Sequence, residues 1–250
     1  MKSLSSIFIL TFYYSISFGQ SSLQVNIPSP QEEAEYIWSN IQDIAFFEQH
    51  NYELSLPQGK LINQLKEKSK SNQLSDNDFE KLLQFIQSDV YKKADYQKAF
   101  EKIKAQQKLV NKMANEIINC RHSWGFKSFD TYQINLTLYG PGGSYNPVDG
   151  SIIIYATPDG RFKQYNNPVN TLIHEIVHIG IEESIIGKYN VPHALKERIV
   201  DHIVLLYFKD ELPDYRIQNM GDKRIDELLK KKKDIKRLDK IVGEFVNQKM

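Results

Sequence analysis

Apolar side chains recur every three or four positions through most of residues 31–120, with polar residues between them. This spacing places apolar side chains on one face of a helix. The clearest run is Ala34, Ile37, Ile41 and Ile44. Ser75 and the acidic residues after it are typical of a helix start, and a long helix is expected over about residues 94–119. The pattern therefore predicts a helical bundle packed against the rest of the chain.

After residue 130 the period changes from helical to alternating. Apolar residues alternate with polar ones between residues 132 and 138, which predicts a strand with one buried face. A Gly-Pro-Gly-Gly loop at 140–143 follows, and Ser151–Tyr155 predicts a second strand after a Pro-Val-Asp-Gly turn. We expect these two strands to form a hairpin, and we expect residues 20–30 to be a flexible leader.

These patterns predict an α+β chain that is predominantly helical. We expect a helical N-terminal region over residues 20–127 and a second domain over residues 128–250. The composition adds mainly exclusions. A hydrophobic fraction of 41% is enough for a packed core, and the net charge of +1 gives no sign of a nucleic-acid partner. The single cysteine excludes an intramolecular disulfide.

Residues 1–19 have the layout of a secretory signal peptide. Lys2 precedes an uncharged apolar run, and Ser17 and Gly19 suit cleavage before Gln20. The run is shorter than the ~20 residues that a membrane span needs, which favours cleavage over an uncleaved anchor. The sequence therefore predicts export to a secreted or periplasmic location, without stable membrane association after cleavage. It does not indicate an oligomeric state.

The strongest chemical signal is His174-Glu175-Ile176-Val177-His178, the pattern H-E-x-x-H. Asn167 and Pro168 predict the start of its helix, because Asn is a good cap and Pro suits the first position. Histidines four residues apart project from one helix face, so both can reach a single zinc ion at ~2.0–2.1 Å. Glu175 points elsewhere, close enough to act on water at the metal without ligating it. The alternative is two ordinary surface histidines beside a carboxylate.

A catalytic zinc site needs a third protein ligand and an open position. The next predicted helix begins at Pro192 and carries His193, Glu197 and Asp201 as one polar stripe on a largely apolar helix. Such a stripe requires partners, because unpaired buried charge is costly. Glu197 as a ligand, with Asp201 accepting the outer N–H of a ligand histidine, would supply them. His193 is the rival ligand, or it could donate to an oxyanion.

The motif HEIVH followed by E-R-I-V-D resembles the H-E-x-x-H…E-x-x-x-D signature of the gluzincins, the thermolysin-like branch of the zinc metallopeptidases. The resemblance spans roughly residues 140–207. It implies three zinc ligands, which are His174, His178 and Glu197. It further implies Glu175 as general base and acid, with Asp201 behind a ligand histidine and Tyr189 as an oxyanion donor.

The resemblance also implies a zincin-like core over residues 128–250, in which a small hairpin or sheet lies beside the active-site helix and the glutamate helix. Members of the family pair the substrate backbone with an edge strand, for which Ser151–Tyr155 is the candidate. Lys196 stands where the family has asparagine.

These features predict an exported zinc metallopeptidase that acts on a peptide or protein substrate, with Glu175 as the general base. The alternative is a non-catalytic exported protein that binds zinc or a partner and keeps a vestigial zincin site. The two differ in coordination, because a catalytic site leaves one position open whereas four protein ligands close a structural site. The helical half could also be a pro-segment that covers the cleft.

Overall fold

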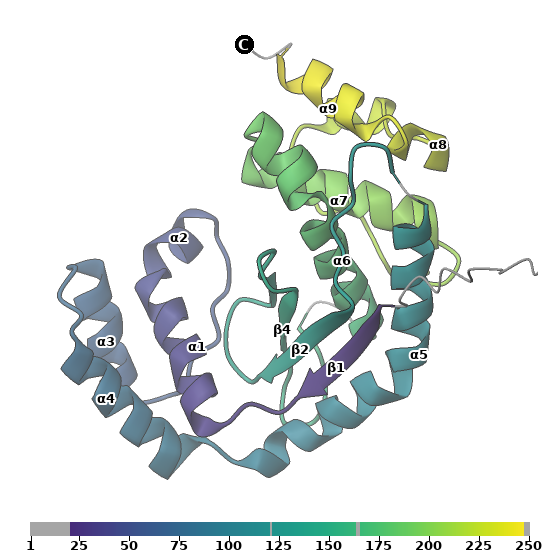
Figure 1. Cartoon of the computed structure of the whole chain (residues 1–250). Helices are drawn as coiled ribbons and strands as arrows, with labels where there is room; N and C mark the ends of the chain where they lie inside the picture. The colour runs from purple at the N-terminus through teal and green to yellow at the C-terminus, as the bar shows by residue number, and fades with distance from the viewer. Residues whose placement is uncertain (1–20, 121, 164–165, 248–250) are drawn as a thin grey trace, which may run out of the picture.

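The computed structural model describes residues 21–120, 122–163 and 166–247. Its main body is built on a four-stranded sheet with the order β1-β2-β4-β3 (Figure 1). The strands are β1 (Ser22–Asn26), β2 (Thr131–Thr137), β3 (Gly143–Tyr145) and β4 (Ser151–Tyr155). β1, β2 and β4 run parallel, and β3 runs antiparallel to β4 at one edge. The expected α+β class with mostly helical content is confirmed.

Two helices cover the sheet and pack against each other. They are α5 (Gln97–Asn119), which follows the 3₁₀ turn η2 (Lys93–Tyr96), and α6 (Pro168–Ile181), which continues into the π-helical turn η3 (Glu182–Gly187). α7 (His193–Phe208) packs on α6. After the 3₁₀ turn η4 (Lys223–Glu227), α8 (Lys232–Ile235) packs on α7 and α9 (Leu238–Asn247) packs on η3.

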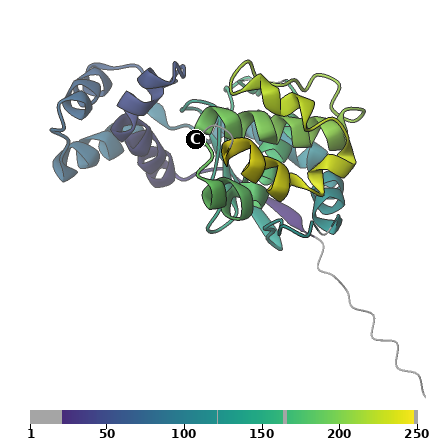
Figure 2. The same cartoon turned by 90° about the horizontal axis from the view of Figure 1, so that it is seen from above.

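The helices of residues 30–90, which we call the helical lobe, have a hydrophobic core of their own. They are α1 (Pro30–Gln42), α2 (Ile44–Gln49), α3 (Lys60–Lys70), α4 (Asp76–Phe85) and the π-helical turn η1 (Ile86–Val90). Side chains such as Ile37, Ile41 and Leu82 are fully buried among them. Ser29 and Ser75 form capping boxes that fix where α1 and α4 begin. Figure 2 shows the lobe to one side of the main body.

The expected leader at residues 20–30 is a wrong prediction, because residues 22–26 form a sheet strand. Leu23 and Val25 are buried and alternate with polar neighbours, and β1 pairs in parallel with β2 along its whole length. β1 and α5 share one hydrophobic core with the elements after residue 128. The boundary between the two hydrophobic cores therefore does not fall at residue 127. In the sequence, the helical lobe lies between β1 and α5, which both belong to the main body.

The expected hairpin of residues 132–138 with 151–155 is also wrong. The loop after β2 reverses the chain at Gly140, where φ is +110°, and β3 forms before β4. The hairpin is thus β3–β4, closed by a turn with Gly150 at φ +75°. β4 lies between β2 and β3, so Ser151–Tyr155 is an internal strand and β3 is the edge strand beside it.

α6 is the most deeply buried helix of the main body. Almost every residue from Pro168 to Ile181 is buried, and the Asn167 side chain caps its start by accepting from the Val169 N–H at 3.1 Å. Near its end the Phe126 ring occupies the space of any Cβ atom at Gly180. The H-E-x-x-H helix is therefore packed on nearly all sides by other parts of the chain.

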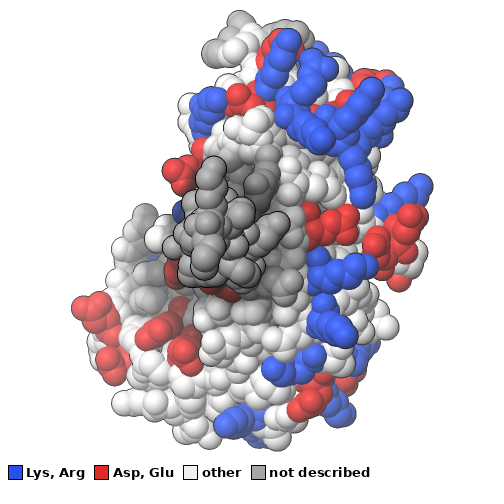
Figure 3. All heavy atoms as spheres, turned by 45° about the vertical axis from the view of Figure 1, so that its right-hand side comes forward, with Lys and Arg blue, Asp and Glu red and all other residues white. Residues whose placement is uncertain are grey.

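Among the described residues, no helix combines the length and the apolar character that crossing a membrane requires. The expected signal peptide, residues 1–19, lies outside the described residues. Figure 3 shows lysine and arginine side chains gathered at the top of one face, with acidic side chains among them. In the C-terminal lysine run, Lys230 pairs with Glu227 and Lys232 with Glu116.

Candidate metal centre

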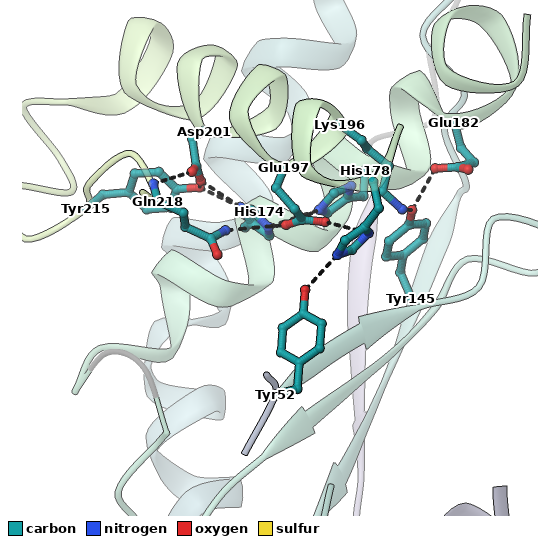
Figure 4. A network of polar contacts seen from close by, with 11 residues as sticks. Tyr52, Tyr145, His174, His178, Glu182, Lys196, Glu197, Asp201, Tyr215 and Gln218 are labelled. Atoms are coloured by element: carbon teal, nitrogen blue, oxygen red, sulfur yellow. Dashed lines mark hydrogen bonds and ion pairs between the residues drawn. The ribbon is translucent and has the colours of Figure 1, made fainter. Parts of the chain in front are cut away.

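α6 and α7 pack side by side and direct three potential metal ligands to one point (Figure 4). His174 and His178 come from adjacent turns of α6, and Glu197 comes from α7. The two Nε2 atoms lie 3.0 Å apart, and they lie 3.2 Å and 3.3 Å from the same Glu197 oxygen, Oε2. Among the described residues, this is the one group of His, Cys, Asp and Glu side chains with the spacing to hold a metal ion.

These separations fit a tetrahedral ion. Ligand atoms at about 2.0–2.1 Å from a zinc ion lie about 3.3–3.4 Å from each other in a tetrahedron. The three distances above fall close to this value. Two imidazole nitrogens and a carboxylate oxygen are also a donor set that zinc prefers. The residues present therefore fit a zinc-type cation as a three-ligand site.

The outer nitrogen of His174 is held by Asp201 and Tyr215. The Tyr215 hydroxyl donates to Asp201 Oδ1 at 2.7 Å, so it can accept from the His174 Nδ1–H at 2.5 Å. Asp201 Oδ1 is itself 3.3 Å from Nδ1. A proton on Nδ1 leaves the Nε2 lone pair free to bind a metal. Asp201 thus lies behind the candidate ligand His174, at the position that the sequence predicts for it.

Other contacts fix the remaining two ligands. The Tyr145 ring stacks on His178 with centroids 4.7 Å apart and planes inclined by 9°. Gln218 donates its backbone N–H to Asp201 Oδ2 at 2.7 Å, and its side-chain amide donates to Glu197 Oε2 at 3.3 Å. α6 is therefore held against β3, and α7 is held by the loop that follows it.

The protonation of the cluster without metal follows from burial and charge. Burial opposes the charged form of His174, but hydrogen bonds with Asp201 and Glu197 raise its pKa to about 10. Burial lowers the pKa of His178 to about 4. Although burial favours a neutral carboxyl, the two imidazoles hold the pKa of Glu197 well below its usual value. Binding of a cation must therefore displace the proton of His174.

Glu175 lies beside the ligands without belonging to them. Its side chain is buried, and burial raises the pKa of Glu175 to about 7. A Cβ atom at Gly143 would overlap the Glu175 carboxylate, so the bare backbone of β3 makes room for this side chain. A carboxylate with a pKa near neutrality is suited to accept and return a proton at ordinary pH.

The ligands and Glu175 line a cleft of about 490 Å³. Besides α6, the β3 hairpin, the start of α7, the loop after α7 and the helical lobe line the cleft. His193 lines it, 3.8 Å from Glu197 through Nδ1 and 2.7 Å from the Tyr52 hydroxyl through Nε2. His193 is not one of the three converging ligands.

Tyr189 is a correction to the expected site. Its hydroxyl donates to Asp239 of α9 at 2.9 Å, its ring packs against Gly243, and it does not line the cleft. Tyr52 and Tyr145 line the cleft instead. No motif or regular spacing in the sequence relates Tyr52, Tyr145 or Tyr215 to the histidines. Loops and a short strand bring these tyrosines to the site from distant parts of the chain.

We expect Asp201→Asn to weaken zinc binding by about 10- to 100-fold, because the outer partner of a ligand histidine sets its orientation and basicity. The amide keeps the shape of the carboxylate but lacks its charge. Competition with a zinc-binding dye measures the affinity. Asp210→Asn, the same change at an exposed position after α7, is the matched control. Equal affinity in both variants would remove Asp201 from the site.

Comparison with protein-family models, curated proteins and solved structures found no significant match to this chain.

Proposed function

We propose that the chain is a zinc-dependent metallopeptidase with a zincin-like core formed by the β3–β4 hairpin, α6 and α7. The observation that carries the proposal is the convergence of two histidines and a glutamate in a cleft that Glu175 also lines. A structural zinc site would need a fourth protein ligand. The metal-ligand group among the described residues has three members, which favours a catalytic over a structural zinc site.

When bound, zinc supplies Lewis-acid chemistry, lowering the pKa of a water molecule and polarising a peptide carbonyl. His174, His178 and Glu197 would hold the ion. Glu175 takes the proton of the attacking water and delivers it to the leaving amine, and its pKa of about 7 in the metal-free chain suits both steps.

The Tyr52 hydroxyl replaces Tyr189 as the donor that we propose for the developing oxyanion. It lines the cleft beside His193, and when it accepts from the His193 Nε2–H at 2.7 Å its own O–H is left to donate to the substrate. Donors aimed at the position where charge develops contribute strongly to hydrolysis.

β3 is the strand that we propose for pairing with the substrate backbone. The Gly142 carbonyl accepts from Tyr155 and the Asn146 N–H donates to Ser151, so the backbone groups of these residues face β4. Because backbone groups alternate sides along a strand, those of Gly143 and Tyr145 face the free edge. An extended peptide can add to that edge as a further strand.

An exported zinc peptidase acting on peptide or protein substrates is also consistent with the signal-like residues 1–19. An unbiased peptide-library digest tests the activity. We expect zinc-loaded protein to cleave, chelation to abolish cleavage, and added zinc to restore it. No cleavage of any peptide by fully zinc-loaded protein would contradict the proposal.

A further inference from the structure

The helical lobe is an insertion within the main body. β1 precedes it and α5 follows it, and both belong to the main hydrophobic core. β1 pairs with β2 over five residues, from Ser22↔Thr131 to Asn26↔Asn135. A single cut after the lobe would separate β1 together with the lobe from the rest of the chain. The helical lobe therefore cannot be removed by one cut without also removing a strand of the sheet. This favours a permanent wall of the cleft over a removable pro-segment.

The part of the lobe that lines the cleft is aromatic. Phe46 and Phe47 of α2 and Tyr52 of the following turn, which we call the aromatic wall, contact one another. The Phe46 ring lies 5.7 Å from that of Phe47 and 6.3 Å from that of Tyr52, measured between centroids. The wall therefore presents a continuous aromatic surface to the interior of the cleft.

Phe46 is unusually open to solvent for its type. It is 43% exposed and is one of three exposed large apolar side chains among the described residues. The other two, Val148 and Leu228, do not line the cleft. An aromatic surface that is open within a cleft is suited to an apolar ligand group.

The aromatic wall lies close to the metal ligands. The Phe46 and His193 rings meet edge to face at 6.1 Å, and Tyr52 bonds His193 at 2.7 Å. His193 in turn lies 3.8 Å from Glu197. One imidazole thus separates the wall from the ligand set, so a group seated on the wall is close to the reacting bond.

We propose, building on the peptidase function above, that the aromatic wall is a specificity subsite. It selects an aromatic or large aliphatic side chain next to the scissile bond of an extended peptide whose backbone pairs with β3. Aromatic rings in edge-to-face or offset contact add favourable interactions to the burial of apolar surface. The helical lobe therefore determines which peptides bind, while α6 and α7 supply the metal ligands and the general base.

Peptide binding to the zinc-loaded Glu175→Gln protein tests this inference without requiring turnover. The probes are fluorescein-labelled hexapeptides of alanine and serine, each with one phenylalanine at a different position, and a phenylalanine-free parent. Fluorescence anisotropy measures the affinity. We expect one placement of phenylalanine to tighten binding about tenfold or more, and Phe46→Ala to remove most of that gain.

Two further variants make the result specific. Leu228→Ala removes another exposed apolar side chain outside the cleft, and it should leave the preference intact. Phe47→Ala should act in the same direction as Phe46→Ala, with zinc content and thermal unfolding measured for each to confirm an intact fold. Equal binding of all peptides, or an unchanged preference in both phenylalanine variants, overturns the inference. Absence of cleavage by zinc-loaded wild type, with the binding preference present, counts against the peptidase function alone.

Discussion

Replacing Glu175 with glutamine should lower peptide hydrolysis by about 10²- to 10⁴-fold, the usual contribution of a positioned general base. Glutamine keeps the size of the side chain in its buried place beside Gly143 but cannot take a proton. Because Glu175 is not one of the converging ligands, zinc content should stay equal to that of wild type. Elemental analysis and initial rates on the same preparation measure both quantities.

Glu183→Gln provides the control for this change. Glu183 lies in the turn directly after α6, and its side chain is 82% exposed, so the same substitution there should leave hydrolysis and zinc content unchanged. Wild-type activity in Glu175→Gln would show that another group accepts the proton. Loss of zinc in that variant would instead make Glu175 part of the ligand set.

Replacing Glu197 with alanine should weaken zinc binding by more than about 100-fold, because removing even an outer partner of a ligand costs about 10- to 100-fold. The change removes Glu197 Oε2, which lies near both imidazole nitrogens. Glu197→Gln, which keeps the shape with a weaker oxygen donor, should fall between alanine and wild type. Competition titration with a zinc-binding dye gives the three affinities.

Glu244→Ala is the control for nonspecific effects of losing a carboxylate. Glu244 is an exposed residue of α9 that pairs with Lys240, and its loss should not change zinc affinity. If Glu197→Ala bound zinc as tightly as Glu244→Ala, the cation would be held elsewhere. Hydrolysis should fall in parallel with zinc occupancy and recover partly at high zinc concentration.

The pairs of site residues within each helix could be predicted because they depend on local spacing, whereas joining Glu197 to the two histidines rested on the polar stripe and the family resemblance. Positions i and i+4 of a helix share a face whatever the helix packs against, so His174 with His178, and Glu197 with Asp201, form pairs before any tertiary structure is known. Helical periodicity also located α1 and α5, and the Asn167-Pro168 cap signal located the start of α6. Each of these expectations needed only residues within a few turns of one another.

The sheet could not be predicted correctly, because its pairing is non-local. Ser22 pairs with Thr131, and no local pattern in either segment indicates the other. The chain between β2 and β4 reads as a simple turn, yet it contains β3, which takes the edge position. Five residues of alternating character in β1, beside prolines and serines, are too short to distinguish from a loop.

The loop residues that contact the candidate ligands also could not be predicted from the sequence. Tyr52 reaches His193 across 141 positions, and Tyr215 reaches His174 across 41. Tyr189 was assigned by its distance from His178 along the chain. η3 packs against α9, and the Tyr189 hydroxyl bonds Asp239 there outside the cleft, so counting residues from His178 failed.

The most direct measurement is anomalous diffraction at the zinc absorption edge from crystals of the zinc-loaded protein. We predict one peak bounded by Nε2 of His174, Nε2 of His178 and the Glu197 carboxylate, at ~2.0–2.2 Å from each, with no fourth protein ligand. A peak at another place with no signal between these three residues would contradict the account. A fourth protein ligand closing the site would contradict its catalytic role.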